Sequence, residues 1–355
     1  MSNHSLSASI ALCTYNGERF LSEQLQSFAA QTVLPAELVV CDDGSQDKTL
    51  EILEDFRRTA PFPVRIFRNE TNLGFVKNFE KAVLLCEHPI IFLSDQDDVW
   101  LPEKVEKSLA VFGDEPETGL LLLSAHTIDA RGERTGDSRD RWEFPDAATE
   151  PITMKRIRRG LWWSGCHMAF RSSLRDVLFP IPRKVLYHDM WILHLLCVMT
   201  DVRILKSPTD LRRLHEKNIT RCLTIPETFR ETGSFGQCLR LYYDRHLDPG
   251  RFLLKFWLYS RLIPRCRRFP EKTRHPEVRE FFEHFKNHLA ARGEAIIRVF
   301  MRPWIIFREI RNGNYARMAH PVCRILGDFL SPPFYGEHGR NVLRQLREEF
   351  TDEMD

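Results

Sequence analysis

The chain has 355 residues, 43% of them hydrophobic and 28% charged, so it can bury a full core and lacks the composition of a disordered protein. Its formal net charge of +2 excludes a surface that is basic throughout, and its nine cysteines include no Cys-x-x-Cys pair, which argues against a disulfide framework and a structural zinc site. There is no apolar signal segment and no stretch of roughly 20 apolar residues, so we expect a cytoplasmic protein whose membrane contact is peripheral.

Short apolar runs alternate with longer amphipathic segments from Ser7 to about Asp129, which is typical of βαβ units. The predicted strands are residues 10–14, 37–42, 64–68, 90–94 and 120–125, and the predicted helices are residues 19–31, 48–58, 75–86 and 102–112. We therefore predict an α/β fold with a mostly parallel sheet flanked by helices. In such a fold, ligands bind beyond the carboxyl ends of the strands.

The rest of the chain divides into two predicted parts. Residues 131–151 are rich in charge and predict a long loop, which is followed by strands at 162–170 and 202–205 with a helix at 189–199 between them. After Thr224 the pattern changes to aromatic-rich helical segments. We place a domain boundary near Leu223, with a catalytic domain at residues 1–223 and a helical C-terminal region at residues 224–355.

Polar turns follow the first two predicted strands. Thr14, Tyr15 and Asn16 end the first strand, and the sequence Asp42-Asp43-Gly44-Ser45 ends the second. Carboxylates in such a turn can bind the edge of a base and the hydroxyls of a ribose, and Asp43 is the expected contact. Alternatively, Asp-Gly-Ser is only turn chemistry and Ser45 caps the next helix.

An apolar strand leads directly into Asp95-Gln96-Asp97-Asp98. Three carboxylates so close together repel one another unless a cation lies between them. Hard oxygen ligands suit Mg²⁺ or Mn²⁺ bridging a diphosphate. The alternative is that Asp97 or Asp98 caps the helix that starts near Pro102.

Two later segments carry further candidates. Asp189 opens an apolar helix, where it is either a helix cap or a catalytic carboxylate. Arg212, His215 and Asn218 can complete a metal shell or hold phosphate oxygens, and the alternative is a solvated basic loop.

Taken together these motifs resemble glycosyltransferase family 2, over roughly residues 7–220. The likeness rests on Thr14-Tyr15-Asn16-Gly17, Asp42-Asp43-Gly44-Ser45, Ser94-Asp95-Gln96-Asp97-Asp98 and His188-Asp189, in this order. The segment at residues 95–100 and the His215/Asn218 element resemble bacterial rhamnosyltransferase-type members of surface-polysaccharide pathways. One departure is that Leu214 and Thr220 stand where such relatives often have Gln and Gly.

The resemblance implies the GT-A fold and a role for each matched residue. The implied nucleotide contacts are Thr14, Tyr15, Asn16, Asp43 and Asp95; the implied metal ligands are Asp97, supported by Asp98 and His215; and the implied pocket for the donor sugar and the acceptor is formed by Trp163, Gly165, His188, Arg212 and Asn218. Asp189 matches the general base, with His188 as its nearest rival.

The implied reaction is transfer of a sugar, rhamnose in the subgroup, from a dTDP or UDP sugar to a hydroxyl of a glycan or lipid-linked acceptor. Mg²⁺ or Mn²⁺ would offset charge on the departing diphosphate while Asp189 takes the proton, in a single displacement with inversion. A nucleotidyltransferase or phosphohydrolase would need a phosphate-gripping first loop, which residues 13–17 lack. A non-catalytic sugar-nucleotide scaffold is the remaining alternative.

The C-terminal third is basic and aromatic. Residues 251–275 contain eight Lys or Arg against one acid, interleaved with Phe252, Phe256, Trp257 and Tyr259, and residues 296–310 repeat the pattern more weakly. Such a helix suits an anionic membrane surface at the inner face of the cell membrane, or equally a helix packed on the catalytic domain. No recognition motif supports nucleic acid as a partner.

Overall fold

The computed structural model describes residues 6–135, 149–159, 161–183, 185, 187–216, 218, 249–297 and 302–315. These residues fall into two compact units. The first contains the described residues of 6–153, 162–218 and 271–274, and the second contains those of 154–161, 249–270 and 275–315. The boundary that we predicted near Leu223 lies outside the described residues.

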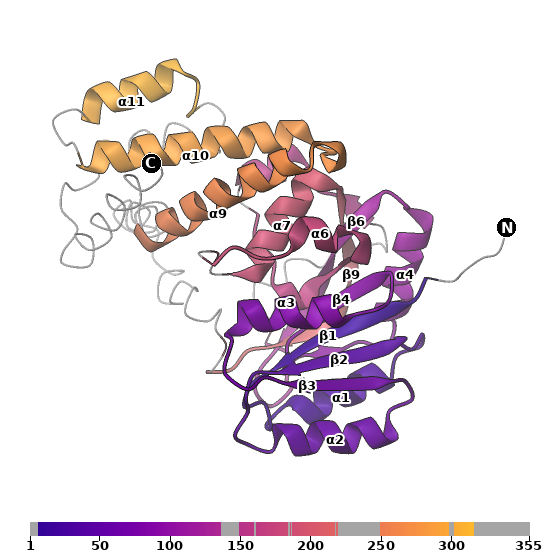
Figure 1. Cartoon of the computed structure of the whole chain (residues 1–355). Coiled ribbons are helices and arrows are strands. Elements are labelled where there is room, and N and C mark those ends of the chain that lie inside the picture. Colours follow the sequence, from indigo (N-terminus) through magenta and orange to yellow (C-terminus); the bar gives the residue numbers. More distant parts are fainter. Residues whose placement is uncertain are drawn as a thin grey trace. The chain divides into compact units, whose positions relative to one another are not determined.

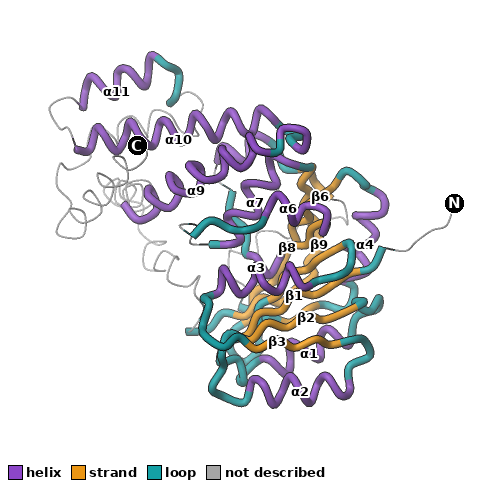
Figure 2. Tube along the Cα trace, in the orientation of Figure 1, coloured by secondary structure: helices purple, strands orange, loops and turns teal. Residues whose placement is uncertain are grey.

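A nine-stranded sheet forms the centre of the first unit (Figure 2). Its strands are β1 (Ala8–Thr14), β2 (Glu37–Asp42), β3 (Val64–Arg68), β4 (Ile90–Ser94), β5 (Val99–Trp100), β6 (Thr118–Ile128), β7 (Thr149–Pro151), β8 (Met168–Arg171) and β9 (Asp201–Arg213). Their order is β3-β2-β1-β4-β8-β6-β9-β5, and β7 pairs with β9. The predicted α/β class is therefore confirmed.

The sheet is mixed, because β8 lies antiparallel between β4 and β6. In the described part of the chain, four pairings are parallel, namely β1 with β2, β2 with β3, β1 with β4, and β6 with β9; the other four are antiparallel. The parallel set β3-β2-β1-β4 brings the carboxyl ends of its strands to one edge. The residues after Thr14, Asp42 and Ser94 therefore meet at that edge.

Helices cover both faces of the parallel half of the sheet. In Figure 1, α1 (Leu21–Ala29) and α2 (Thr49–Thr59) lie on one face, and α3 (Phe75–Leu85) lies on the other. Because side chains alternate along a strand, β1 turns Ile10 and Leu12 into a core cluster with Phe28 of α1. The remaining helices of this unit are α4 (Lys104–Asp114), α6 (Arg175–Leu178) and α7 (His188–Met199).

Three predicted elements differ from the structure. The predicted strand at 202–205 is a 13-residue strand, β9, because β6 pairs with it through bulges along its length. The predicted loop at 131–151 ends in strand β7, which pairs with β9. The predicted strand at 162–170 begins only at Met168, since Gly165–His167 forms a turn of 3₁₀-helix.

The second unit consists of helices. They are α5 (Met154–Arg159), α9 (Pro249–Arg268), α10 (Pro276–Ile297) and α11 (Arg302–Arg311). Tyr259 of α9 stacks on Phe282 of α10, with ring centroids 4.8 Å apart. His288 of α10 lies 3.3 Å from the carboxylate of Glu309 in α11. None of the described helices combines the length and the apolar character needed to cross a membrane.

A short strand pairing ties the acidic segment after β4 to the end of β9. Val99 and Trp100 of β5 pair antiparallel with Leu211 and Asp210. Next to this pairing, Lys104 at the start of α4 forms an ion pair with Asp210, and both side chains are fully buried. The Lys104 ammonium also lies 3.7 Å from the centroid of the Trp100 ring. The acidic segment is thus anchored in the core on its carboxyl side.

We predict that Lys104→Ala lowers the free energy of unfolding by about 3–5 kcal/mol, because it leaves the Asp210 carboxylate buried without its cation. Urea unfolding measures the change. The matched control is Lys107→Ala, which breaks a pair with Glu103 on the surface of the same helix and should change stability by less than about 0.5 kcal/mol. Equal effects of the two variants would contradict the prediction.

Candidate active site

A cavity of about 720 Å³ opens at the carboxyl ends of β1, β2 and β4. The predicted site residues that line it are Thr14, Tyr15, Asn16, Asp43, Asp95, Asp97, Asp98, Gly165, His188, Asp189, Arg212, His215 and Asn218. These residues come from segments far apart in the sequence, and the topology of the sheet brings them together. A cavity of this size is in the range of small-molecule binding sites.

Trp163 is the predicted site residue that does not line this cavity. Its side chain is buried, and its indole N–H donates a hydrogen bond of 2.9 Å to the carbonyl of Leu123 in β6. A buried indole needs such a partner for its N–H. Trp163 therefore packs in the core beneath the loop that carries Gly165.

The loop after β1 is held by Gln96 of the acidic segment. The Gln96 side chain accepts a hydrogen bond from the backbone N–H of Tyr15 at 2.8 Å and donates one to the Tyr15 carbonyl at 3.0 Å. Asn16 has a φ of 49°, a left-handed conformation that asparagine tolerates, and its side chain accepts a hydrogen bond from the N–H of Gln46. Tyr15 remains half exposed beside the cavity. Gln96 was not among the residues predicted to form the site.

The two carboxylates after β2 have different partners. Asp42 is fully buried and accepts hydrogen bonds from the hydroxyls of Thr14 and Ser45. Asp43 accepts from Asn69, from the backbone N–H of Leu73 at 2.8 Å and from that of Gly74 at 3.0 Å. The Asp43 carboxylate thus fixes the loop before α3.

Ser45 is not the cap of the next helix, which corrects the alternative interpretation of this turn. Helix α2 begins at Thr49, and the side chain that accepts a hydrogen bond from the N–H of Thr49, at 3.0 Å, is that of Asp47. The Ser45 hydroxyl donates to Asp42 and accepts from the N–H of Asn16 at 2.9 Å. Its function is to join the two turns.

Asp95, Asp97 and Asp98 form a cluster in which oxygen atoms from the three side chains lie within 4.8 Å of one another. Burial, followed by the negative charges of Asp97 and Asp98, raises the pKa of Asp95 to about 8. Burial and the charge of Asp97 likewise raise the pKa of Asp98. Carboxylates that repel one another in this way are suited to a divalent cation, which removes the repulsion and prefers oxygen ligands.

The end of β9 and the residues after it hold this cluster. His215 Nε2 lies 2.7 Å from Asp97 Oδ2, and the side-chain amide of Asn218 donates to the same oxygen at 3.2 Å. Arg213, which our sequence analysis did not assign, donates its backbone N–H to Asp98 at 2.9 Å and its Nε–H to the Asp97 carbonyl at 3.0 Å. The Arg213 side chain is only 2% exposed, which indicates a structural role that the sequence alone does not show.

Neither Asp97 nor Asp98 caps helix α4, as the alternative interpretation would require. The helix begins at Lys104 after Glu103, and no side-chain cap is present. The strand β5 separates the two carboxylates from the helix. Their position is therefore set by the β5–β9 pairing.

Asp189 lies in the first turn of α7 and lines the cavity with a side chain that is 6% exposed. Burial raises the pKa of its carboxyl to about 6, although hydrogen bonds from backbone groups of Met190 and Gly165 oppose the shift. The position that precedes the helix is occupied by Tyr187, so Asp189 does not stand at the N-cap. Its carboxylate accepts a hydrogen bond from the N–H of Met190 at 2.7 Å. A carboxylate with this pKa can take up a proton near neutral pH.

His188 is held against Gly165 by aromatic rings. Its imidazole stacks on Phe79 with centroids 4.2 Å apart, and Phe75 meets it edge-on at 5.9 Å. Burial lowers the pKa of His188 to about 3, so the ring is neutral. No hydrogen-bond partner for either ring nitrogen is found among the described residues. With this pKa, the imidazole of His188 is a weaker base than the carboxylate of Asp189.

Aromatic side chains form one wall of the cavity, and they were not predicted from the sequence as site residues. Phe75 and Phe79 of α3, four residues apart, line it together with Tyr187. Their helical spacing was interpreted only as the apolar face of a helix that packs on the sheet. Apolar and aromatic walls with a few polar groups are typical of small-molecule sites.

Part of the chain that carries this site matches known proteins. Residues 9–178 match the family model described as glycosyl transferase family 2. The uncharacterized protein Rv1520 of Mycobacterium tuberculosis is 33% identical over 244 residues, which cover 66% of each chain. A dTDP-rhamnosyl transferase of Shigella flexneri, RfbG, is 35% identical over 102 residues, 28% of this chain and 35% of that protein.

Among solved structures, the chain resembles residues 1–349 of Staphylococcus aureus TarS in complex with UDP. The TM-score is 0.57 and the identity is 17%, and the match covers 97% of this chain and 92% of that one. At this identity the likeness shows the fold, which is the GT-A fold that the motifs implied. The chain spans 66% of the length of the first curated relatives that it matches.

We predict that Gly165→Ala disturbs the site, because a Cβ at this position would lie 2.4 Å from His188 Nε2. Forcing a methyl group into a packed site costs about 1–3 kcal/mol of stability. The matched control is Gly113→Ala in helix α4, where a Cβ meets nothing within 4 Å, so that alanine stabilises the helix by about 0.5–1 kcal/mol. Thermal unfolding of both variants checks the prediction, and a stable Gly165→Ala protein would refute it.

Proposed function

Because residues 9–178 belong to glycosyltransferase family 2, we propose that this protein transfers a sugar from a nucleotide diphosphate sugar to a hydroxyl of a glycan acceptor, with inversion at the anomeric carbon. The observation that carries the proposal is one cavity lined by both the acidic cluster at Asp95–Asp98 and the separate carboxylate of Asp189. The acidic cluster is suited to bind a metal ion and a diphosphate, and the Asp189 carboxylate is suited to accept a proton.

The donor binds along the turns after β1 and β2 in this proposal. Thr14, Tyr15, Asn16 and Asp43 contact the nucleotide, and Asp95 lies near the ribose and the sugar. The TarS structures are complexes with UDP and with UDP-GlcNAc, and the Shigella relative is named a dTDP-rhamnosyl transferase. We therefore propose a UDP or dTDP sugar as the donor, with rhamnose as the first sugar to test and surface polysaccharide as the product.

Asp97 is the main carboxylate for Mg²⁺ or Mn²⁺ in this proposal, with Asp98 and His215 in support. When bound, the ion offsets the negative charge that the diphosphate acquires as it leaves. The mutual repulsion of the three carboxylates and the contacts of His215 and Asn218 with Asp97 Oδ2 support this assignment. Arg212, which also lines the cavity, adds a cationic side chain that can hold phosphate oxygens.

Asp189 is the proposed base. It accepts the proton of the acceptor hydroxyl while the hydroxyl oxygen forms a bond to the anomeric carbon. The bond from that carbon to the diphosphate breaks on the opposite side, and its electron pair leaves with the phosphate oxygen. One displacement gives inversion, so no covalent sugar intermediate is needed. The neutral His188 and Gly165 form part of the pocket around the donor sugar and the acceptor.

Peripheral contact with the inner face of the cell membrane is the last part of the proposal. Helix α9 buries Leu258, Tyr259 and Leu262, so these side chains of the segment at residues 251–275 are not exposed to a membrane surface. Helix α11 instead exposes Trp304, Phe307 and Ile310 at three-residue spacing. Its basic residues Arg308 and Arg311 complement an anionic surface, so α11 is the better candidate for lipid contact.

We predict that UDP or dTDP binds only with a divalent cation and that Asp97→Ala weakens this binding at least about tenfold, or 1.4 kcal/mol. Calorimetry with Mn²⁺ and with a chelator measures both effects. Asp114→Ala, at an exposed position at the end of α4, is the control and should bind normally. Equal affinity of the unaltered protein for UDP or dTDP with and without chelator would contradict the proposal that a metal ion takes part in binding.

We predict that Asp189→Asn retains the fold and donor binding but lowers turnover by roughly a hundredfold or more, because the amide cannot accept the proton. The pKa of Asp189 is raised to about 6, so the carboxylate that acts as base is present above this pH and is lost below it. In the unaltered protein kcat/KM should therefore fall about tenfold per pH unit below pH 6. The assay is release of UDP or dTDP in the presence of acceptor, with Asp114→Asn as control. Near-normal transfer by Asp189→Asn would remove this residue from the mechanism.

We predict that the protein floats with anionic liposomes at low ionic strength and that salt releases it. Replacing Trp304 and Phe307 by alanine should abolish flotation, because these side chains supply the exposed apolar face of α11. Leu84→Ala is the matched control, since Leu84 is an exposed apolar residue on α3 of the other unit. Flotation that persists without Trp304 and Phe307, or that never occurs, rules out α11 as the contact.

A further inference from the structure

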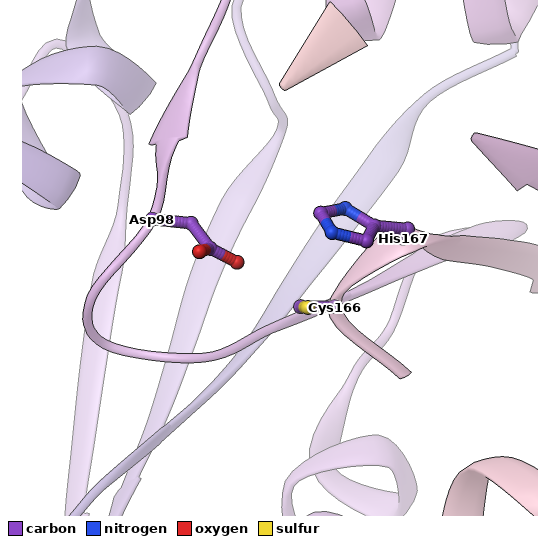
Figure 3. Close-up of side chains that lie close together, drawn as sticks. All are labelled: Asp98, Cys166 and His167. Atoms are coloured by element: carbon purple, nitrogen blue, oxygen red, sulfur yellow. The ribbon is translucent and has the colours of Figure 1, made fainter. Parts of the chain in front are cut away.

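Behind the acidic cluster lies a second group of metal-ligating side chains, formed by Asp98, Cys166 and His167. One ligand atom from each lies within 4.8 Å of the other two, and all three side chains are buried. Figure 3 shows the imidazole of His167 and the sulfur of Cys166 facing the Asp98 carboxylate. The group combines nitrogen, sulfur and oxygen, whereas Asp95, Asp97 and Asp98 offer oxygen alone.

The imidazole of His167 lacks the partners that a buried ring normally has. It is 5% exposed, and no hydrogen-bond partner of either nitrogen is found in the described part of the chain. Nδ1 lies 3.4 Å from Asp210 Oδ2, close enough for electrostatic contact without a well-directed hydrogen bond. Histidines that bind metals through one nitrogen commonly face a carboxylate with the other. Asp210 is itself fixed by its ion pair with Lys104.

Backbone structure fixes the other two ligands. Asp98 Oδ1 accepts from the N–H of Arg213 at 2.9 Å, which orients the carboxylate and leaves it further acceptor capacity. Cys166 and His167 belong to one 3₁₀ turn, Gly165–His167, which precedes β8. Asp98 and Cys166 also line the cavity, so an ion can enter from there.

We propose that Asp98, Cys166 and His167 form a Zn²⁺ site, which shares Asp98 with the acidic cluster but does not use Asp97, with a fourth position open toward the cavity. A set of one thiolate, one imidazole and one carboxylate suits Zn²⁺ and disfavours Mg²⁺ and Mn²⁺, which prefer oxygen ligands. When the bond from Sγ to zinc forms, the thiol proton leaves to solvent. This site goes beyond the glycosyl transfer proposed above.

The absence of a Cys-x-x-Cys pair argued against a structural zinc site in the sequence. That argument concerns ligands on one short segment. Here the ligands come from positions 98 and 166–167, which meet because β8 pairs antiparallel with β4. The spacing of these three residues in the sequence therefore does not predict that they meet.

Titration of the full-length protein with Co²⁺, a spectroscopic substitute for Zn²⁺, tests the proposal. A thiolate bound to cobalt gives a charge-transfer absorption that oxygen ligands do not give. We expect this band in the unaltered protein, its loss on addition of one equivalent of Zn²⁺, and its persistence in excess Mn²⁺. Absence of the band in the folded protein overturns the proposal.

Variants identify the ligands. Cys166→Ser and His167→Gln should each weaken Co²⁺ binding at least about tenfold, and Cys166→Ser should also remove the band. Cys197→Ser, a buried cysteine on α7, is the matched control, and Asp97→Asn should keep the band because Asp97 belongs to the other site. An unchanged band in Cys166→Ser overturns the proposal. If Cys166→Ser does not fold, X-ray absorption of the zinc-loaded unaltered protein decides: sulfur at about 2.3 Å supports the site and oxygen-only coordination overturns it.

Discussion

The antiparallel pairing of β5 with β9 is the constraint on which the candidate active site depends. The pairing is short, Val99 with Leu211 and Trp100 with Asp210, yet it brings the acidic segment beside the end of β9. Before β5 lie the carboxylates of the acidic cluster, and after β9 come His215 and Asn218, which reach Asp97. The buried ion pair of Lys104 with Asp210 holds the pairing from the core. The carboxylates of the acidic cluster and the side chains that contact Asp97 are thus positioned by one feature of the sheet.

The sequence predicted those parts of the fold and site that depend on local pattern. The parallel strands and the carboxylates after β2 and β4 follow from apolar runs that end in acidic turns, and the structure places Asp43 and Asp97 in the same cavity. It did not predict contacts made across the mixed half of the sheet. Arg213 reaches Asp98 over 115 positions of sequence, and the antiparallel insertion of β8 leaves no periodic signal. Trp163 was misplaced for the same reason, since its partner is Leu123 of β6.

Two groups of potential metal-ligating side chains share one residue at this edge of the sheet. Asp95 and Asp97 line the cavity and offer oxygen atoms only. Asp98 lies close to both of them and also to the thiol of Cys166 and the imidazole of His167. Asp98 is therefore the point at which the two groups meet. Arg213 donates its backbone N–H to the Asp98 carboxylate and its Nε–H to the Asp97 carbonyl, so it holds both this side chain and the backbone before it.

Gln96 has a consequence for how a ligand meets this cavity. Its amide binds both the N–H and the carbonyl of Tyr15, so the loop after β1 and the acidic loop after β4 are joined as one body. Gly17 lies so close to this amide that a Cβ there would come within 2.3 Å of Gln96 Oε1, which keeps the junction tight. Loops that are already joined lose little conformational freedom on binding. A ligand that spans both loops, with one end on each, therefore meets a surface that folding has ordered in advance.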